Sequence, residues 1–320
     1  MKLKHQIKSI AIALLLMTPP LANATQPVQA SQTKAVQRVF ATPEDAAKAL
    51  IEAMHKHDMK SLLAVIGPSS RSWLSSGDEV ADRKDMERFL AAYDRKNSIS
   101  HQADDKALLL VGDDYWPFPA PIVRNGNGWV FDAAAGREEL ANRRVGRNEL
   151  DVIQTLLAAV DAQREYAADD PDKNGYHDYA RRFASSKGKK DGLFWPVKAG
   201  EPLSPLGPLV AEAARDGYGK KSSSDKSGGK PAAYHGYRYR ILTAQGKRAP
   251  GGAYSYLVGD KMIGGFAIVA YPAKYGVSGV MTFLVNHDGV VYEKDLGKST
   301  EVEAVGMRRF DLDPGWKKAQ

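Results

Sequence analysis

The sequence predicts an α+β fold, in which helices precede short antiparallel strands twice along the chain. Residues 251–297 hold the densest run of β-branched and aromatic residues, cut at intervals by Gly and Pro, which is typical of short antiparallel strands. A long helical pattern over 148–168 comes before that run, and helices followed by strand-like segments fill residues 39–145. At 320 residues, and with roughly 150 residues per domain as a guide, two domains are expected.

The first 24 residues are typical of a secretory signal. Lys2, Lys4 and Lys8 form a positive region, residues 10–17 an apolar core, and Ala22-Asn23-Ala24 a small-residue cleavage motif. The apolar core is shorter than the roughly 20 residues that cross a bilayer, which disfavours an uncleaved anchor. We therefore expect cleavage after Ala24 and a periplasmic or secreted bacterial protein with no later transmembrane span.

Composition narrows the class of partner. The chain has no cysteine, so no disulfide framework holds it together. Its formal net charge is +7, and three of those positive charges belong to the signal lysines. Nucleic-acid binding needs a clustered basic footprint, which the mixed charges of the remaining chain do not form. We expect no nucleic-acid partner and an envelope ligand, glycan or protein instead.

The elements of the N-terminal half follow local signals. Thr42 is an N-cap, Pro43 takes the first helical position, and Glu44 and Asp45 place negative charge at the helix N-terminus. Further helices are expected over residues 58–66 and 82–96, and strands over 99–103, 107–111, 122–123 and 129–132. This order resembles the cone-shaped folds related to nuclear transport factor 2, which implies helices packed on a curved sheet.

In the C-terminal half, a long helix packs on a small antiparallel sheet. Charged helical residues run over 133–144, and the long amphipathic pattern then covers 148–168. Strands are expected within 234–242, 261–271, 280–286 and 290–294, and a short helix over 179–185. The predicted division is a signal peptide (1–24), a flexible lead (25–38), an N-terminal α+β domain (39–145) and a C-terminal α+β domain (146–312) with a mobile loop (220–230).

An acidic loop after the long helix is a candidate calcium site. Oxygen-bearing residues stand at positions 1, 3, 5 and 9 of the calcium-loop pattern, with Gly at position 6. Arg181 stands at position 12, where a bidentate Glu is expected. An Asx-rich turn that caps the next helix and needs no metal is the alternative interpretation. The candidate calcium ligands are Asp170, Asp172, Asn174, Tyr176 and Asp178, and no other cofactor is indicated.

Aromatic residues alternate with polar ones over 234–242, as in a half-buried strand. Stacking on Tyr234, His235, Tyr237 and Tyr239 would suit a glycan or peptide, whereas packing in the core or at a sheet edge would need no ligand. Elsewhere, Ser278 lies one residue short of a nucleophile-elbow pattern, and His287 stands in a turn. No nucleophile, base and orienting partner can be assembled from spacing, so no catalytic residue is assigned.

Several long motifs resemble one family. They are DGLFWP at 191–196, YHGYRYRILTAQG at 234–246, GGAYSY at 251–256, KMIGGFAIVAYPAKYG at 261–276 and SGVMTFLVNHDGVVYEKDLG at 278–297. They are similar to the secreted bacterial proteins grouped as domain of unknown function 2950. That resemblance implies no particular activity or catalytic residue.

The sequence favours an exported cell-envelope protein that binds a ligand, glycan or protein partner without catalysis. Two alternatives stay open: an envelope hydrolase with an unrecognised active site, and a calcium-stabilised scaffold that resembles pseudopilin domains. A cavity with converging titratable groups would favour the hydrolase, and a shallow aromatic surface would favour the binding protein.

Overall fold

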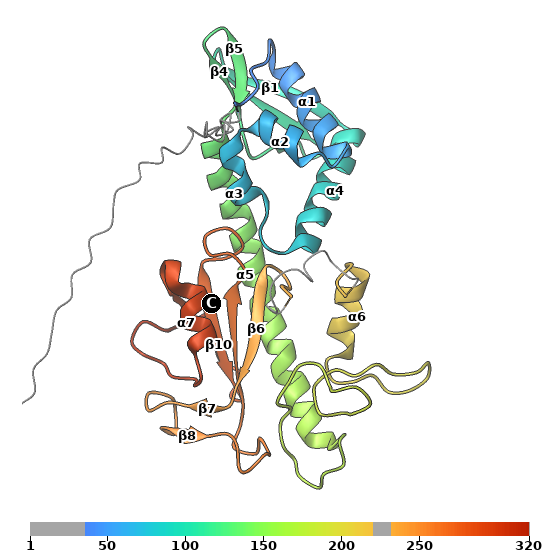
Figure 1. Cartoon of the computed structure of the whole chain (residues 1–320), viewed down its shortest axis with the longest axis vertical. Coiled ribbons are helices and arrows are strands. Elements are labelled where there is room, and N and C mark those ends of the chain that lie inside the picture. The colour runs from blue at the N-terminus through green and yellow to red at the C-terminus, as the bar shows by residue number, and fades with distance from the viewer. Residues whose placement is uncertain (1–35, 220–231, 320) are drawn as a thin grey trace, which may run out of the picture. The chain divides into compact units, whose positions relative to one another are not determined.

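The computed structural model describes residues 36–219 and 232–319. The predicted signal peptide, most of the flexible lead and the loop at 220–230 therefore lie outside the described residues. The end of the lead is anchored, because the Gln37 side-chain amide donates to the carbonyls of Ile66 and Phe131, both at 2.8 Å. Helices and antiparallel sheets confirm the α+β class (Figure 1). None of the described helices is both long and apolar enough to span a membrane.

Helices and a small sheet share one core in the N-terminal half. The helices are α1 (Pro43–His55), α2 (Met59–Ile66), α3 (Arg71–Leu74) and α4 (Glu79–Arg95), with the 3-10 turn η1 (Pro68–Ser70). The strands are β1 (Asn97–Ala103), β2 (Lys106–Val111), β3 (Trp116–Pro117), β4 (Ile122–Asn125) and β5 (Gly128–Phe131). They pair in the order β1-β2-β4-β5, and β3 pairs with β2. Leu50, Trp73, Leu109 and Phe131 are buried between helices and sheet.

Polar caps start these helices where the sequence predicts them. The Thr42 hydroxyl accepts from Asp45 N at 3.1 Å, and the Asp58 carboxylate accepts from Ser61 N at 3.1 Å. Each cap satisfies a backbone donor that the first helical turn leaves free. The resemblance to nuclear transport factor 2 stays a prediction.

A single helix, α5 (Ala133–Asp169, 37 residues), replaces the two helices predicted at 133–144 and 148–168. Residues 145–147, with Gly146 at their centre, separate the two predicted helices. The helix continues because residues on either side are buried and bonded: Arg144 donates to Trp73 O at 3.1 Å, and Asn148 Nδ2 donates to Ser278 O at 2.8 Å. These contacts offset the roughly 1 kcal/mol that an interior Gly costs a helix.

Helix α5 contributes to both hydrophobic cores. Leu140 packs against the N-terminal core, whereas Leu156 and Val160 belong to the C-terminal core. The described residues, 36–219 and 232–319, nevertheless belong to one compact unit. The division into two domains near residue 145 stays a prediction.

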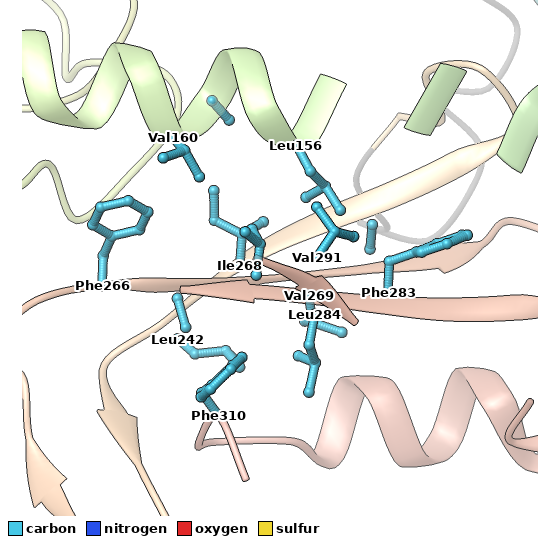
Figure 2. Close-up of a cluster of buried hydrophobic side chains, with 14 of the residues drawn as sticks. Leu156, Val160, Leu242, Phe266, Ile268, Val269, Phe283, Leu284, Val291 and Phe310 are labelled. Carbon is cyan, nitrogen blue, oxygen red and sulfur yellow. The ribbon is translucent and has the colours of Figure 1, made fainter. Parts of the chain in front are cut away.

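The C-terminal sheet has the order β12-β11-β10-β9-β6. Figure 2 shows Leu156 and Val160 of α5 on one side of it and Phe310 on the other. Its strands are β6 (Tyr237–Leu242), β9 (Ala267–Pro272), β10 (Met281–Asn286), β11 (Val291–Asp295) and β12 (Lys317–Lys318). The remaining elements are α6 (Gly207–Arg215), the pair β7 (Ala244–Gln245) and β8 (Tyr254–Ser255), η3 (Gly297–Ser299) and α7 (Thr300–Gly306). The predicted strands are confirmed, with ends that differ by a few residues.

The helix predicted over 179–185 is absent, and this segment is irregular. Its backbone groups find partners elsewhere. Gln163 exchanges two hydrogen bonds of 2.8 Å with the backbone of Ala180, and Tyr179 N donates to Met262 O at 2.9 Å. Because side-chain and long-range backbone partners satisfy these polar groups, a helical turn is not needed there.

Candidate functional site

The four aromatic candidates separate into two groups. Tyr237 is fully buried, its hydroxyl donates to Met281 O at 2.9 Å, and its ring centroid lies 5.8 Å from that of Phe283. Tyr239 is partly buried in β6. Tyr234 and His235 instead stand together at the turn that leads into β6, so the structure brings these two into one surface and places Tyr237 in the core.

The turn at Tyr234–Tyr237 has a strained backbone. Tyr234 N donates to Tyr237 O at 2.8 Å, and Tyr237 N donates to Tyr234 O at 3.1 Å. His235 has φ 50° and Gly236 φ 73°, the left-handed values that a tight I′ hairpin turn requires. A Cβ on Gly236 would lie 2.4 Å from Asn148 Nδ2, so the buried Asn148 side chain would have to shift to admit it. A left-handed His costs about 1–2 kcal/mol, and surrounding contacts must therefore hold it.

A buried carboxylate from the N-terminal half provides those contacts. Asp78 is 2% exposed and precedes α4. Its Oδ2 accepts from Gly236 N at 2.9 Å and from the Tyr218 hydroxyl at 2.8 Å. Its Oδ1 accepts from Ala81 N at 3.0 Å and caps α4. One side chain therefore starts a helix and fixes a turn that lies 158 residues further along the chain.

Tyr218, Tyr234 and His235 form what we call the aromatic cluster. The ring centroids of Tyr234 and His235 are 4.1 Å apart, and those of Tyr218 and Tyr234 are 5.0 Å apart, at 64° and 71° respectively. All three side chains are partly exposed. Edge-to-face packing at these distances is the arrangement that aromatic quadrupoles favour. Tyr218 follows α6 and was not among the sequence candidates.

The polar groups of the cluster are hydrogen-bond donors and acceptors near neutral pH. His235 Nδ1 lies 3.2 Å from Asp151 Oδ2 of α5. Burial, followed by the nearby carboxylates of Glu212 and Asp216, raises the pKa of Tyr234 to about 12. Burial and Asp78 also raise the pKa of Tyr218. Both phenols therefore keep their protons and can donate.

A buried arginine and a partly buried carboxylate support the segment that carries Asp78. Arg144 is 6% exposed and its Nη2 lies 3.5 Å from Asp82 Oδ1, while Asp82 Oδ2 accepts from Ser76 N at 2.8 Å. Burial raises the pKa of Asp82, which Arg144 partly opposes, and burial lowers the pKa of Arg144. Lys274, in the loop between β9 and β10, donates to Ser75 O at 3.1 Å. The residues before α4 are thus held by both α5 and the C-terminal sheet.

The acidic loop is closed by its own hydrogen bonds. The Asn174 amide donates to Asp172 Oδ2 at 2.8 Å and to Asp178 Oδ1 at 2.9 Å. The Asp170 carboxylate accepts from the backbone N of Asn174 and Gly175. Asn174 Oδ1 accepts from Tyr176 N at 2.8 Å, as in an Asx turn. Within residues 36–219 and 232–319, no group of three or more His, Asp or Glu side chains could hold a metal ion.

Calcium binding at Asp170, Asp172, Asn174, Tyr176 and Asp178 stays a prediction. If these residues hold Ca²⁺, millimolar calcium will raise the melting temperature, and Asp172→Ala will remove that rise. An unchanged melting temperature of the parent protein in calcium would exclude the site.

Two features outside the cluster offer less chemistry. The Ser278 hydroxyl is engaged in its own turn, donating to Lys274 O at 3.2 Å and accepting from Lys274 N at 3.0 Å. An open hollow of about 320 Å³ is lined by the exposed Arg137 and Glu138 together with Ala134, Ala141, Asn142 and Gly276. It offers no buried titratable group, which an enzyme site is expected to have.

A second aromatic region, residues 112–116, which we call the aromatic loop, leads from the end of β2 into the first residue of β3. Tyr115 and Trp116 are 52% and 57% exposed. Lys96 Nζ lies 4.2 Å from the Tyr115 ring centroid and donates to its hydroxyl at 2.8 Å, and the Arg143 guanidinium lies 4.7 Å from the Trp116 centroid. Tyr115 also has a left-handed backbone, with φ 52°.

Comparison with known proteins gives a family and no activity. No curated protein and no solved structure matches the chain. The family profile described as "Protein of unknown function (DUF2950)" matches residues 37–319. That range includes Asp78, Asp151 and the aromatic cluster, and it confirms the resemblance carried by the motifs between 191 and 297. The chain belongs to the DUF2950 family.

Proposed function

We propose that this protein binds a glycan of the bacterial cell envelope through the aromatic cluster, without catalysis. The observation that carries the proposal is the set of partly exposed, edge-to-face rings at Tyr218, Tyr234 and His235, locked from below by the buried Asp78. The secretory-type sequence of residues 1–24 supports an envelope location.

The chemistry of the cluster suits a sugar ring. A sugar presents apolar C–H faces that stack on aromatic rings and hydroxyl edges that need donors and acceptors. Aromatic side chains with polar tips serve both needs. Here the rings of Tyr218 and Tyr234 supply apolar faces, the Tyr234 hydroxyl can donate, and the Asp151 carboxylate beside His235 can accept.

Rigidity favours binding over mere packing. A surface that is ordered before the ligand arrives loses less conformational entropy on association. The turn has left-handed backbone at His235, a glycine packed closely against Asn148, and two hydrogen bonds to Asp78 Oδ2, which together fix it. Strained backbone that is held by its surroundings is often found at functional sites.

The test is a titration with saccharide fragments released from purified bacterial cell wall by muramidase digestion. We expect saturable chemical-shift changes of the Gly236 amide and neighbouring signals of the ¹⁵N-labelled protein. Tyr234→Ala should weaken binding about tenfold, because roughly 1.4 kcal/mol of stacking is lost. Tyr254→Ala is the matched control, since Tyr254 is also partly exposed (39%) but belongs to β8. Equal binding by both variants, or no binding by the parent protein, would refute the proposal.

One contact favours a hydrolase as the second candidate. The 3.2 Å contact of His235 Nδ1 with Asp151 could orient the imidazole for proton transfer. A hydrolase would release new reducing ends from the cell-wall fragments, and Asp151→Asn, which keeps one accepting oxygen, would slow that release far more than it would raise the Kd for the fragments. Fragments recovered intact after long incubation would exclude the hydrolase and leave binding as the remaining proposal.

A further inference from the structure

We infer that Asp78 is a positioning residue through which the N-terminal half of the protein sets the conformation, and hence the affinity, of the aromatic cluster. The inference rests on the proposed function for its effect on binding. Its structural part, the control of the turn by Asp78, can be tested without any ligand.

The two oxygens of Asp78 have separate tasks. Oδ1 accepts from Ala81 N at 3.0 Å, which starts α4. Oδ2 accepts from Gly236 N at 2.9 Å and from the Tyr218 hydroxyl at 2.8 Å. The helix cap therefore depends on one oxygen of Asp78 and the turn on the other. A substitution that keeps only one accepting oxygen can separate these two roles.

Tyr218 and the turn are also joined to each other. The backbone N of His235 lies 3.4 Å from the Tyr218 hydroxyl, which itself donates to Asp78. The Tyr218 hydroxyl thus links the Asp78 carboxylate to the backbone of His235. Gly236 N of the turn and the hydroxyl of Tyr218, which follows α6, both donate to Oδ2. Loss of this acceptor would therefore free the turn and Tyr218 at the same time.

The position of Asp78 itself is fixed by the N-terminal half and α5. Asp78 N donates to Ser76 Oγ at 3.1 Å, and Ser76 N donates to Asp82, which faces Arg144. A buried carboxylate held on several sides is rigid, since each unpaired polar group in such a place would be costly. A change in the packing of α4 against α5 would consequently move the acceptor on which the cluster depends.

Asp78→Asn is the decisive variant. Its side-chain oxygen can still cap α4, but its amide nitrogen cannot accept from Gly236 or Tyr218. Asp132→Asn is the matched control, because Asp132 caps α5 through one oxygen, Oδ1, which accepts from Ala134 N and Ala135 N, both at 3.0 Å. Tyr218→Phe removes one of the two bonds and serves as a second variant if Asp78→Asn does not fold.

The first measurement is hydrogen exchange of the Gly236 amide in the free protein. We expect at least about tenfold faster exchange in Asp78→Asn and no change in Asp132→Asn. The second is the Kd for the cell-wall fragments, which should rise about tenfold in Asp78→Asn and less than twofold in Asp132→Asn. The effects of Asp78→Asn and Tyr218→Phe on the Kd should be less than additive, as expected for residues that act through one contact.

The outcomes separate the two proposals. Unchanged Gly236 exchange in folded Asp78→Asn and in Tyr218→Phe would overturn the positioning role, whatever the ligand. Faster exchange without any fragment binding by the parent protein would support the positioning role and refute the proposed function. Faster exchange with an unchanged Kd would show that the affinity does not depend on the turn, and would overturn the coupling.

Discussion

The aromatic cluster and the aromatic loop have similar components and different supports. Each combines aromatic side chains with a non-glycine residue in left-handed backbone, His235 at φ 50° and Tyr115 at φ 52°. Beneath the cluster lies the buried carboxylate of Asp78. The rings of the loop instead lie under the cations Lys96 and Arg143, while its backbone is joined to the end of α4 by the bond from Gly112 N to Lys96 O at 2.8 Å.

The two supports differ in the free energy that they contribute to stability. A cation over an exposed ring contributes about 0.5–1 kcal/mol. A buried donor that loses its acceptor costs about 1–3 kcal/mol, and two donors depend on Asp78 Oδ2. The turn of the cluster therefore depends on a buried carboxylate, whereas the aromatic rings of the loop depend on cations over exposed ring faces. Buried hydrogen bonds that hold a strained, partly exposed surface are what we expect beneath a binding site.

The largest expected effect is the loss of stability when Asp78, beneath the aromatic cluster, is removed, compared with removal of Lys96 from the aromatic loop. Asp78→Ala should lower the free energy of unfolding by about 3 kcal/mol, because it removes a helix cap and leaves buried donors unpaired. Lys96→Ala should lower it by less than about 1 kcal/mol. Urea denaturation at pH 7 measures both. Similar losses in the two variants would contradict the distinction between buried and surface support.

Two glycines with nearly equal backbone angles give a smaller, closely matched test. Gly236 has φ 73° and Gly112, in the aromatic loop, has φ 72°. A Cβ would lie 2.4 Å from Asn148 Nδ2 at Gly236, but 3.6 Å from its nearest neighbour, Ala92, at Gly112. Gly112→Ala should cost about 1 kcal/mol of unfolding free energy through strain alone, and Gly236→Ala about 2–3 kcal/mol through strain plus overpacking. Equal costs would mean that the turn at Gly236 can relax.

Local signals in the sequence predict much of the fold. The cap at Thr42, the alternation within β6 and the β-branched runs of β9 to β11 identify elements that the structure confirms. The continuity of α5 could not be predicted, because it depends on distant partners of Arg144 and Asn148. The irregular segment at 179–185 likewise depends on Gln163.

The site was only partly predictable for the same reason. Tyr234 and His235 stand in a run whose alternation indicates a half-buried strand. Asp78, Asp151 and Tyr218 join them from other elements, and no local spacing signals that meeting. Tyr237 follows the same alternation but points into the core. Periodicity indicates that a strand has two faces and leaves open which face a ligand can reach.

The smallest expected effect is a pH dependence from the buried pair that supports the cluster. The folded-state pKa of Asp82 is raised above its ordinary value of 3.8, mainly by burial. The native state therefore binds this proton more tightly than the unfolded chain does. The contribution of Asp82 to the free energy of unfolding is most favourable below pH 3.8 and declines as the pH rises through the folded-state pKa.

Urea denaturation of the parent protein and Asp82→Asn between pH 3.5 and 7 checks this sign. We expect the parent protein to lose stability relative to the variant as the pH rises through the window just above 3.8. A parent protein that gains stability relative to Asp82→Asn over that window would mean that Arg144 outweighs burial.

The most direct test of the central claim is a comparison of Tyr234→Ala with Trp116→Ala in binding to muramidase-released cell-wall fragments. Trp116 is the more exposed aromatic residue, at 57%, so exposure alone would make it the better contact. We predict that Tyr234→Ala raises the Kd about tenfold and that Trp116→Ala changes it less than twofold. A larger loss in Trp116→Ala than in Tyr234→Ala would place binding on the aromatic loop and contradict the account.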